Sequence, residues 1–286
     1  MTNEDRASFL LAEAGLPADL SLLTIASDYV RRTRRGRWFG LVGGVLLGAS
    51  LPVAAGQALL ALPLIPAGYL LGILVSELVT PLPARRAVRI AELRPRRRTD
   101  LLPHWARATY WVLLIPVLAA PLLMLMHRAP GVTRIVTADY TCATAVPNWP
   151  HGPFVLAAVL GAAGLGIAEI TLAALTRRAR PADNPELARL DDVMRRMSAR
   201  SAAAGAAAVG LTMLAMISQE LDQVGHARLC PAQPTVPMPA AYPWAASLVP
   251  WTSWAGLILI FAAILVAVMS QWRNTISKPI PRRGIA

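Results

Sequence analysis

The sequence predicts an all-α membrane protein with six transmembrane helices, and three observations indicate this class. Hydrophobic residues make up 55% of the 286-residue chain and charged residues only 15%, compared with about 25% in soluble domains. The apolar residues gather in stretches long enough to cross a bilayer, and the basic residues gather between these stretches. The hydrophobicity excludes an intrinsically disordered chain, and two cysteines are too few for a disulfide-dense secreted module.

Six apolar stretches have the length that a membrane span requires, roughly 20 residues. No residue from Trp38 to Ser76 is charged, and Pro52, Gly56 and Gln57 mark a turn that divides this stretch into two spans. We place the spans at about 38–56, 58–80, 109–127, 153–176, 201–220 and 251–272. The chain then consists of a cytoplasmic N-terminal segment (1–37), a transmembrane domain (38–272) and a cytoplasmic tail (273–286).

The distribution of basic residues predicts the orientation of the chain. Of 28 basic residues, 25 fall on one side of the predicted spans, and only Arg128, Arg134 and Arg228 fall on the other. Cytoplasmic loops carry the excess of arginine and lysine, so both termini are expected to be cytoplasmic (N-in/C-in). The eight tryptophans agree with this arrangement because all of them fall near span ends, where indole rings favour the headgroup zone.

The bias of the basic residues toward arginine indicates the source. Lys278 is the only lysine, and alanine, proline and glycine are abundant. Codon usage in a GC-rich bacterial genome is the simplest explanation. We therefore expect a multi-pass protein of the bacterial cytoplasmic (plasma) membrane.

The net charge of +12 does not point to a nucleic-acid partner, because no nucleic-acid-binding motif accompanies it. The densest basic cluster, Arg96, Arg97 and Arg98, lies in the loop after the second span. We interpret this cluster as a contact with anionic lipids of the inner leaflet.

The two cysteines fall in different extracytoplasmic loops. Cys142 follows the third span and Cys230 follows the fifth, on the oxidising side of the membrane, so we expect a disulfide that ties the two loops together. The alternative is a pair of unrelated thiols. No ligand spacing supports a metal site that also uses nearby histidines, and we expect no metal.

Small residues predict close helix packing in the first span. Gly36, Gly40, Gly44 and Gly48 recur every four residues and therefore share one helical face. This face is expected to pack against another helix of the same chain, with homo-oligomerisation as the alternative. The small residues 201–205 at the start of the fifth span predict a second tightly packed face.

Two cytoplasmic segments are predicted to be helical. Residues 17–35 carry an apolar stripe and a basic end, which suits either a helix on the inner leaflet or a surface for a partner. Asn184 and Pro185 form a helix-start signature. The helix that follows includes the i,i+4 pair Asp191–Arg195, and we expect it to continue directly into the fifth span.

A repeated motif carries the candidate functional residues. The ends of the second and fourth spans both read Gly-x4-Glu-x7-Arg-Arg, offset by 92 residues, which suggests a tandem repeat of helical hairpins. The motif places Glu77 and Glu169 inside the cytoplasmic edge of the membrane, where a charged residue normally faces the bundle interior or pairs. These acids form either a substrate, ion or proton site, or structural pairs with nearby arginines. Glu220 and Asp222, at the outer end of the fifth span, are expected to be solvated.

The motifs of common enzyme classes are absent from the sequence. There is no Walker A sequence, no His-Glu-x-x-His and no Gly-x-Ser-x-Gly. Intramembrane enzymes need convergent His, Asp or Ser groups, which the spans lack. We therefore expect no catalytic residue and no cofactor.

Two stretches, Arg96–Pro103 and Leu190–Arg195 together with the following Ser201–Gly205 run, resemble a group of uncharacterised actinobacterial multi-span integral membrane proteins. The resemblance implies a source and a topology, but no activity and no functional residue.

Two functions remain open from the sequence. The first, weakly favoured by the repeated glutamates, is a transporter membrane subunit, a permease-like partner of a separate ATPase. The alternative is a non-transporting scaffold or signalling protein that binds a cytoplasmic regulator, which the scarcity of polar residues in the spans favours. Fold-level analogy does not decide between them.

Overall fold

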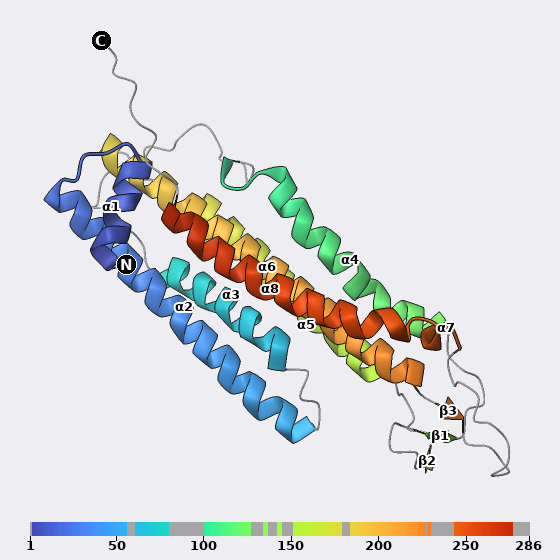
Figure 1. Ribbon diagram of the computed structural model, residues 1–286. Helices are drawn as coiled ribbons and strands as arrows, with labels where there is room; N and C mark the ends of the chain where they lie inside the picture. Colours follow the sequence, from blue (N-terminus) through green and yellow to red (C-terminus); the bar gives the residue numbers. More distant parts are fainter. Residues whose placement is uncertain are drawn as a thin grey trace.

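The computed structural model describes residues 2–55, 61–79, 100–126, 134–136, 142–144, 151–178, 184–226, 228–229 and 243–276. Within these residues the protein is an elongated bundle of helices (Figure 1). The helices are α1 (Asn3–Glu13), α2 (Leu20–Ala55), α3 (Ala61–Val79), α4 (His104–Met126), α5 (His151–Arg177), α6 (Pro185–His226), α7 (Pro243–Ala246) and α8 (Val249–Ile276).

The long helices lie side by side along one axis and give the bundle two distinct ends. Helix α1, the start of α2, the start of α6 and the end of α8 lie together at one end, which we call the α1 end. Three short strands lie at the opposite end: β1 (Arg134–Val136), β2 (Cys142–Thr144) and β3 (Arg228–Leu229). Because α1 and the end of α8 share one end, the chain crosses the bundle an even number of times.

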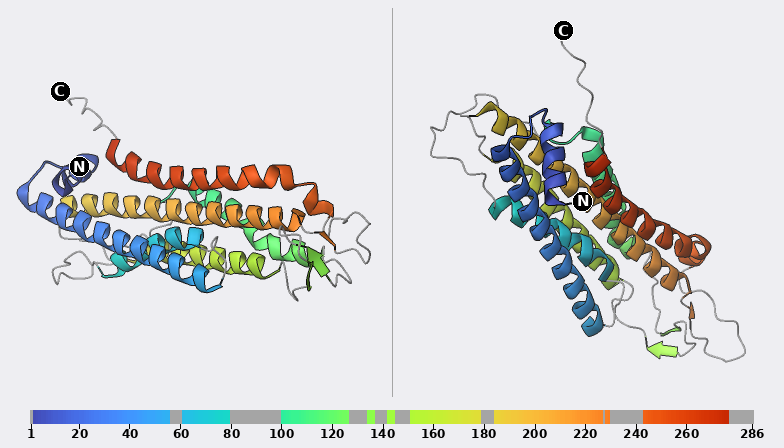
Figure 2. Two further views of the ribbon diagram at one scale, coloured as in Figure 1. Left: turned by 60° about the horizontal axis from the view of Figure 1, so that its bottom comes forward. Right: turned by 60° about the vertical axis from the view of Figure 1, so that its left-hand side comes forward.

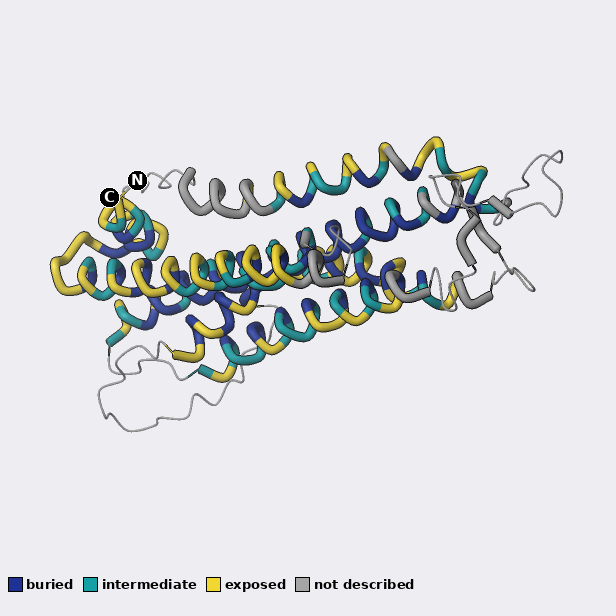
Figure 3. The backbone as a smooth tube through the Cα atoms, turned by 90° about the horizontal axis from the view of Figure 1, so that it is seen from below, coloured by how far each residue is buried: buried dark blue, intermediate teal, exposed yellow. Residues whose placement is uncertain are grey.

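Five helices in the described part of the chain are long and apolar enough to cross a membrane, which makes this a multi-pass membrane protein. The candidate spans lie in α3, α4, α5, α6 and α8. Large apolar side chains point outward along several of them, including Leu122 of α4 and Phe261 of α8, which are 63% and 70% exposed. Figure 3 shows this exposed outer surface around a buried interior. The predicted first span corresponds to the second half of α2, which is not among the five.

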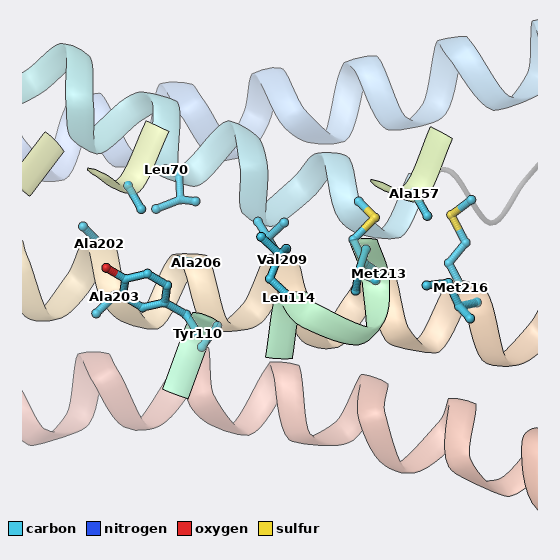
Figure 4. Packing of buried hydrophobic residues seen from close by; sticks show 14 of the residues in the cluster. Leu70, Tyr110, Leu114, Ala157, Ala202, Ala203, Ala206, Val209, Met213 and Met216 are labelled. Carbon is cyan, nitrogen blue, oxygen red and sulfur yellow. The ribbon is translucent and has the colours of Figure 1, made fainter. Parts of the chain in front are cut away.

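Helix α6 forms the centre of the bundle. It packs against α3, α4, α5 and α8, and its middle turns carry small buried residues, among them Ala202, Ala203 and Ala206. Figure 4 shows Leu70, Tyr110 and Leu114 from neighbouring helices packed over this surface. The small side chains let four helices approach one axis, as the run at 201–205 predicts.

The start of α6 agrees with its sequence signature. The side chain of Asn184 accepts hydrogen bonds from the backbone N–H groups of Glu186 and Leu187, at 2.8 and 3.2 Å. Proline occupies the first helical position, where its missing N–H costs nothing. The helix then runs without a break to His226, which confirms that the loop helix and the fifth span are one element.

The glycine face of α2 packs against α3 of the same chain. A Cβ added at Gly36 would lie 2.7 Å from the Cβ of Ser76, and one at Gly40 would meet the carbonyl oxygen of Gly68. On α3, Gly72 meets α2 in the same way. Backbone contact of this kind needs glycine on both helices. The face is therefore covered within the monomer from Gly36 to Gly44.

Helix α1, the first half of α2 and the first turns of α6 form a second small core, which we call the platform (Figure 2). Leu10 and Leu11 of α1 pack with Leu22 of α2 and Met194 of α6. Thr2 and Asp5 begin α1 with a capping box. The buried side of residues 17–35 thus packs against the chain's own helices, and α2 continues into the bundle as one helix.

At the other end, the strands join the two loops that carry the cysteines. Strand β1 pairs antiparallel with both β2 and β3, and Val136 lies opposite both Cys142 and Arg228. Cys230 lies just beyond β3, outside the described residues, and the side chain of Cys142 is likewise outside them, so the disulfide stays a prediction. Arg96, Arg97 and Arg98 also lie outside the described residues.

Candidate functional site

Glu77 lies in the last turn of α3, where the bundle meets the platform, and its side chain is almost completely buried. Its Oε1 accepts hydrogen bonds from the hydroxyl of Tyr29 at 2.9 Å and from the hydroxyl of Ser198. Its Oε2 accepts a hydrogen bond from Arg178 Nη1 at 3.1 Å. Besides α3, this carboxylate is therefore held by α2, by α6 and by Arg178, which directly follows α5.

Arg178 connects Glu77 to a second buried ion pair. Its Nη2 faces Asp191 Oδ1 at 3.8 Å, and Asp191 accepts a 2.7 Å hydrogen bond from Arg195 Nε. The side chains of Asp191 and Arg195 have no exposed surface. Arg195 also donates to the carbonyl oxygens of Leu175 and Arg178, at 2.9 and 2.8 Å. The network of two carboxylates and two guanidiniums is thus neutral, and it fixes the end of α5 against α6.

This network corrects the expected character of the i,i+4 pair. Exposed pairs of this kind contribute a few tenths of a kcal/mol, and the sequence suggested such a pair for Asp191 and Arg195. Because both groups are buried, removing either partner leaves a buried charge unpaired, which costs about 3–5 kcal/mol. The pair therefore lies in the interior and not on the surface.

Glu169, the second repeated acid, has a similar environment between α5 and α4. Arg107 of α4 binds it with two parallel hydrogen bonds of 3.0 Å, from Nε to Oε1 and from Nη2 to Oε2. The hydroxyl of Tyr110 donates to Oε1 at 2.7 Å. The Glu169 side chain is 18% exposed and that of Arg107 is 38% exposed, so this pair is more accessible than that of Glu77.

The two copies of the repeated motif therefore use the same chemistry. In each, a glycine lets a neighbouring helix approach: a Cβ at Gly72 would meet α2, and one at Gly164 would lie 2.8 Å from Val209 of α6. In each, the glutamate five residues later is bound by an arginine and a tyrosine. The last arginine of the second copy, Arg178, binds the glutamate of the first copy.

The electrostatics favour structural pairs over an open binding site. Burial raises the pKa of Tyr29 above its ordinary value, and the nearby Glu77 charge raises it further. Tyr29 therefore remains a neutral donor to Glu77 at physiological pH. Each glutamate accepts hydrogen bonds from a guanidinium and at least one hydroxyl.

The polar groups at the other end of α6 differ from the expectation. Glu220 is buried, with 8% of its surface exposed, so the expectation that it is solvated is wrong. Asp222 accepts a 3.2 Å hydrogen bond from Thr252 of α8. Helix α8 covers this side of α6, which the order of elements in the sequence does not reveal.

Sequence reasoning identified the two glutamates but not their partners. The sequence pattern does not indicate these partners, because each lies far along the chain from the glutamate that it binds. They are Tyr29, Arg107, Tyr110 and Ser198. One usable signal existed: Arg107 and Tyr110 are polar groups one turn apart at the inner end of a predicted span. No protein-family model, curated protein or solved structure matches the chain.

Proposed function

We propose that the protein is a membrane scaffold whose platform binds a cytoplasmic partner through an acidic surface. The proposal rests on the orientation that the basic loops predict, which places the α1 end in the cytoplasm. One observation carries it: residues 2–28, which form α1 and the first turns of α2, hold five acidic residues and one basic residue, Arg6, in a chain of net charge +12. The exposed acidic residues of its first two helices and their connection are Glu4, Asp5, Glu13, Asp19 and Asp28.

This acidic surface is unsuited to lipid contact. The cytoplasmic leaflet carries negative charge and attracts basic segments, so carboxylates next to it are repelled. The platform has its own apolar core and needs no lipid to cover it. Complementary charge steers protein partners together and selects among them, so the expected partner presents a basic patch.

The bundle itself supports a scaffold better than a substrate path. Both intramembrane glutamates are already bound by arginine and tyrosine, and the described part of the bundle is centred on the alanine-rich face of α6. A carboxylate that binds a substrate or moves a proton must exchange partners. At Glu77 such an exchange would leave the largely buried guanidinium of Arg178 without this partner, which is costly.

The permease-like subunit is the second candidate, and one observation favours it. Helices α2 and α6 run from the platform into the bundle without a break. A partner that moves the platform would therefore move the spans directly, as a separate ATPase would require. The same docking surface serves both candidates, and the nature of the partner distinguishes them.

Photo-crosslinking in cells tests the proposal. A photoreactive amino acid at Ser8 or Thr24, both exposed on the platform, is expected to give a discrete adduct with one cytoplasmic protein. The same group at Val159, which is 59% exposed on α5, is the lipid-facing control and should give none. Absence of a platform-specific adduct would overturn the scaffold proposal.

Charge reversal shows whether the adduct depends on the acidic surface. Asp28→Lys should abolish it, whereas Asp100→Lys, the same change at an exposed acid in the turn before α4, should not. An adduct that survives Asp28→Lys would contradict the electrostatic argument. An ATPase whose hydrolysis rate depends on this protein supports the permease-like candidate, and a regulator supports the scaffold.

A further inference from the structure

A cavity of about 340 Å³ lies at the junction of the platform and the bundle. Its walls come from α1, α2, α3 and α6, and three arginines line it: Arg6 from α1, and Arg34 and Arg37 from α2. Its size falls within the range of sites that hold small-molecule ligands, about 300–1,000 Å³. It is separate from the Glu77 network except at Tyr29, whose hydroxyl already binds Glu77.

The three guanidiniums lack acidic partners in the cavity. No carboxylate is among the described residues that line it. In the described part of the chain, the Nε atoms of Arg6 and Arg37 are buried and have no hydrogen-bond partner. Arg34 has one weak contact, from Nη1 to Asn3 Oδ1 at 3.4 Å. Buried polar atoms in proteins are normally hydrogen-bonded, so the two unsatisfied Nε–H groups on the half-buried Arg6 and Arg37 indicate a missing acceptor, such as an anion.

The arginines also repel one another. Burial lowers the pKa of Arg6, and the positive charges of Arg34 and Arg37 lower it further. The three groups are therefore close enough for an anion among them to relieve the repulsion. Phosphate suits this position because guanidinium donates two parallel hydrogen bonds to phosphate oxygens.

The remaining walls indicate what the phosphate is attached to. Arg37 immediately precedes the apolar part of α2, and Trp38, Leu41 and Tyr69 line the cavity on that side. Trp38 is 57% exposed and the adjacent Phe39 is 77% exposed, so this side opens toward lipid. Indole rings mark the headgroup level of a bilayer. The cavity thus combines a cationic part at headgroup level with an apolar exit into the membrane.

We propose that this cavity binds the phosphate headgroup of an anionic phospholipid from the leaflet at the α1 end. Basic pockets between transmembrane helices recognise such headgroups. Three guanidiniums favour a lipid with more than one negative charge, such as cardiolipin, over phosphatidylglycerol, and both over zwitterionic phosphatidylcholine. The site lies on residues other than Arg96–Arg98 and does not depend on which partner the platform binds.

The test is lipid binding to the purified, delipidated full-length chain in mild detergent, measured by native mass spectrometry. Cardiolipin, phosphatidylglycerol and phosphatidylcholine are compared with inorganic phosphate and glycerol 3-phosphate. The wild type should bind cardiolipin most tightly. The double substitution Arg6→Gln/Arg37→Gln should weaken binding at least about tenfold, since each charged hydrogen bond contributes about that factor or more.

A matched control separates the site from overall charge. Arg31→Gln/Arg35→Gln removes two exposed arginines from α2, the helix that carries Arg37, and should leave binding unchanged. Equal loss in both double variants, or equal binding in both, would overturn the proposal. Phosphatidylcholine binding as tightly as cardiolipin would overturn it too, and free phosphate competing as well as the lipid would reassign the cavity to a soluble anion.

Thermal unfolding distinguishes a loss of lipid binding from a loss of the fold. Without lipid, Arg6→Gln/Arg37→Gln should have a Tm equal to or above that of the wild type, because the substitution removes repulsion. With cardiolipin, only the wild type and the control should gain stability. A lower Tm for Arg6→Gln/Arg37→Gln without lipid would show that these arginines serve the fold itself, and would contradict the proposal.

Discussion

Glu77 in the last turn of α3 binds Arg178, 101 residues later in the chain, through a 3.1 Å hydrogen bond. The Glu77 side chain is 1% exposed and that of Arg178 is 12% exposed. This contact joins the two halves of the repeated motif, since the arginine of the second copy binds the acid of the first. The repeated motif therefore marks two positions that are connected by a direct contact, and not two independent sites.

The Glu77–Arg178 pair should contribute strongly to stability. Arg178→Gln leaves Glu77 with only hydroxyl donors, so we expect the free energy of unfolding to fall by up to about 3–5 kcal/mol. Thermal unfolding of the purified protein in detergent measures it. Arg177→Gln, the same change at the exposed neighbour, is the control and should leave the Tm nearly unchanged. A similar Tm for both variants would show that the pair contributes little.

The two repeated glutamates should differ in their effect on stability. Glu77→Gln disrupts a fully buried group, whereas Glu169→Gln acts on a pair whose arginine is 38% exposed and is therefore partly screened by solvent. We expect the larger fall in Tm for Glu77→Gln. The reverse order would indicate that Glu169 is the more deeply embedded acid in the membrane.

Gly40 should tolerate no side chain, because its missing Cβ faces the α3 backbone at Gly68 and Gly72. Gly40→Ala forces the two helices apart, and overpacking of this kind costs about 1–3 kcal/mol. On the same helix, a Cβ added at Gly43 has nothing within 4 Å, so Gly43→Ala is the matched control. Comparison of the two Tm values checks the prediction, and equal values would contradict the packing of α2 on α3.

Asp191 and Arg195 should show strong coupling in a double-mutant cycle. Asp191→Asn and Arg195→Met each leave a buried partner group unsatisfied, at about 3–5 kcal/mol. The double variant should lose less than the sum of the two single losses, because neither charge is then left alone. Additive losses would show that Arg195 acts through the carbonyl oxygens of Leu175 and Arg178 instead.

Stability should fall at alkaline pH because of Tyr29. Its pKa is raised in the folded protein, whereas an unfolded tyrosine titrates near its ordinary value of about 10. The stabilising contribution is therefore complete below about pH 10 and is lost as the pH rises above it. Tm values between pH 7 and pH 11 should fall less steeply above pH 10 for Tyr29→Phe than for the wild type. Parallel curves would contradict this role.

The sequence predicted those features that depend on local spacing. The start of α6 at Asn184 and the shared face of Gly36, Gly40 and Gly44 follow from helical geometry, and the structure shows both. It could not predict which groups bind Glu77, because Tyr29, Ser198 and Arg178 come together only after four elements pack. The buried state of Asp191 was hidden for the same reason: an i,i+4 pair looks identical whether its helix is covered or exposed.

The length of α6 has a consequence for how the two ends of the molecule are related. Its 42 residues extend about 63 Å at 1.5 Å per residue, twice the thickness of a hydrocarbon core of about 30 Å. A single helix thus sets the angular position of Asp191 in the platform and of Ala206 in the bundle. Each residue inserted between them would turn one end relative to the other by about 100°. The spacing along α6 must therefore be kept to the residue, even where the intervening side chains are interchangeable alanines.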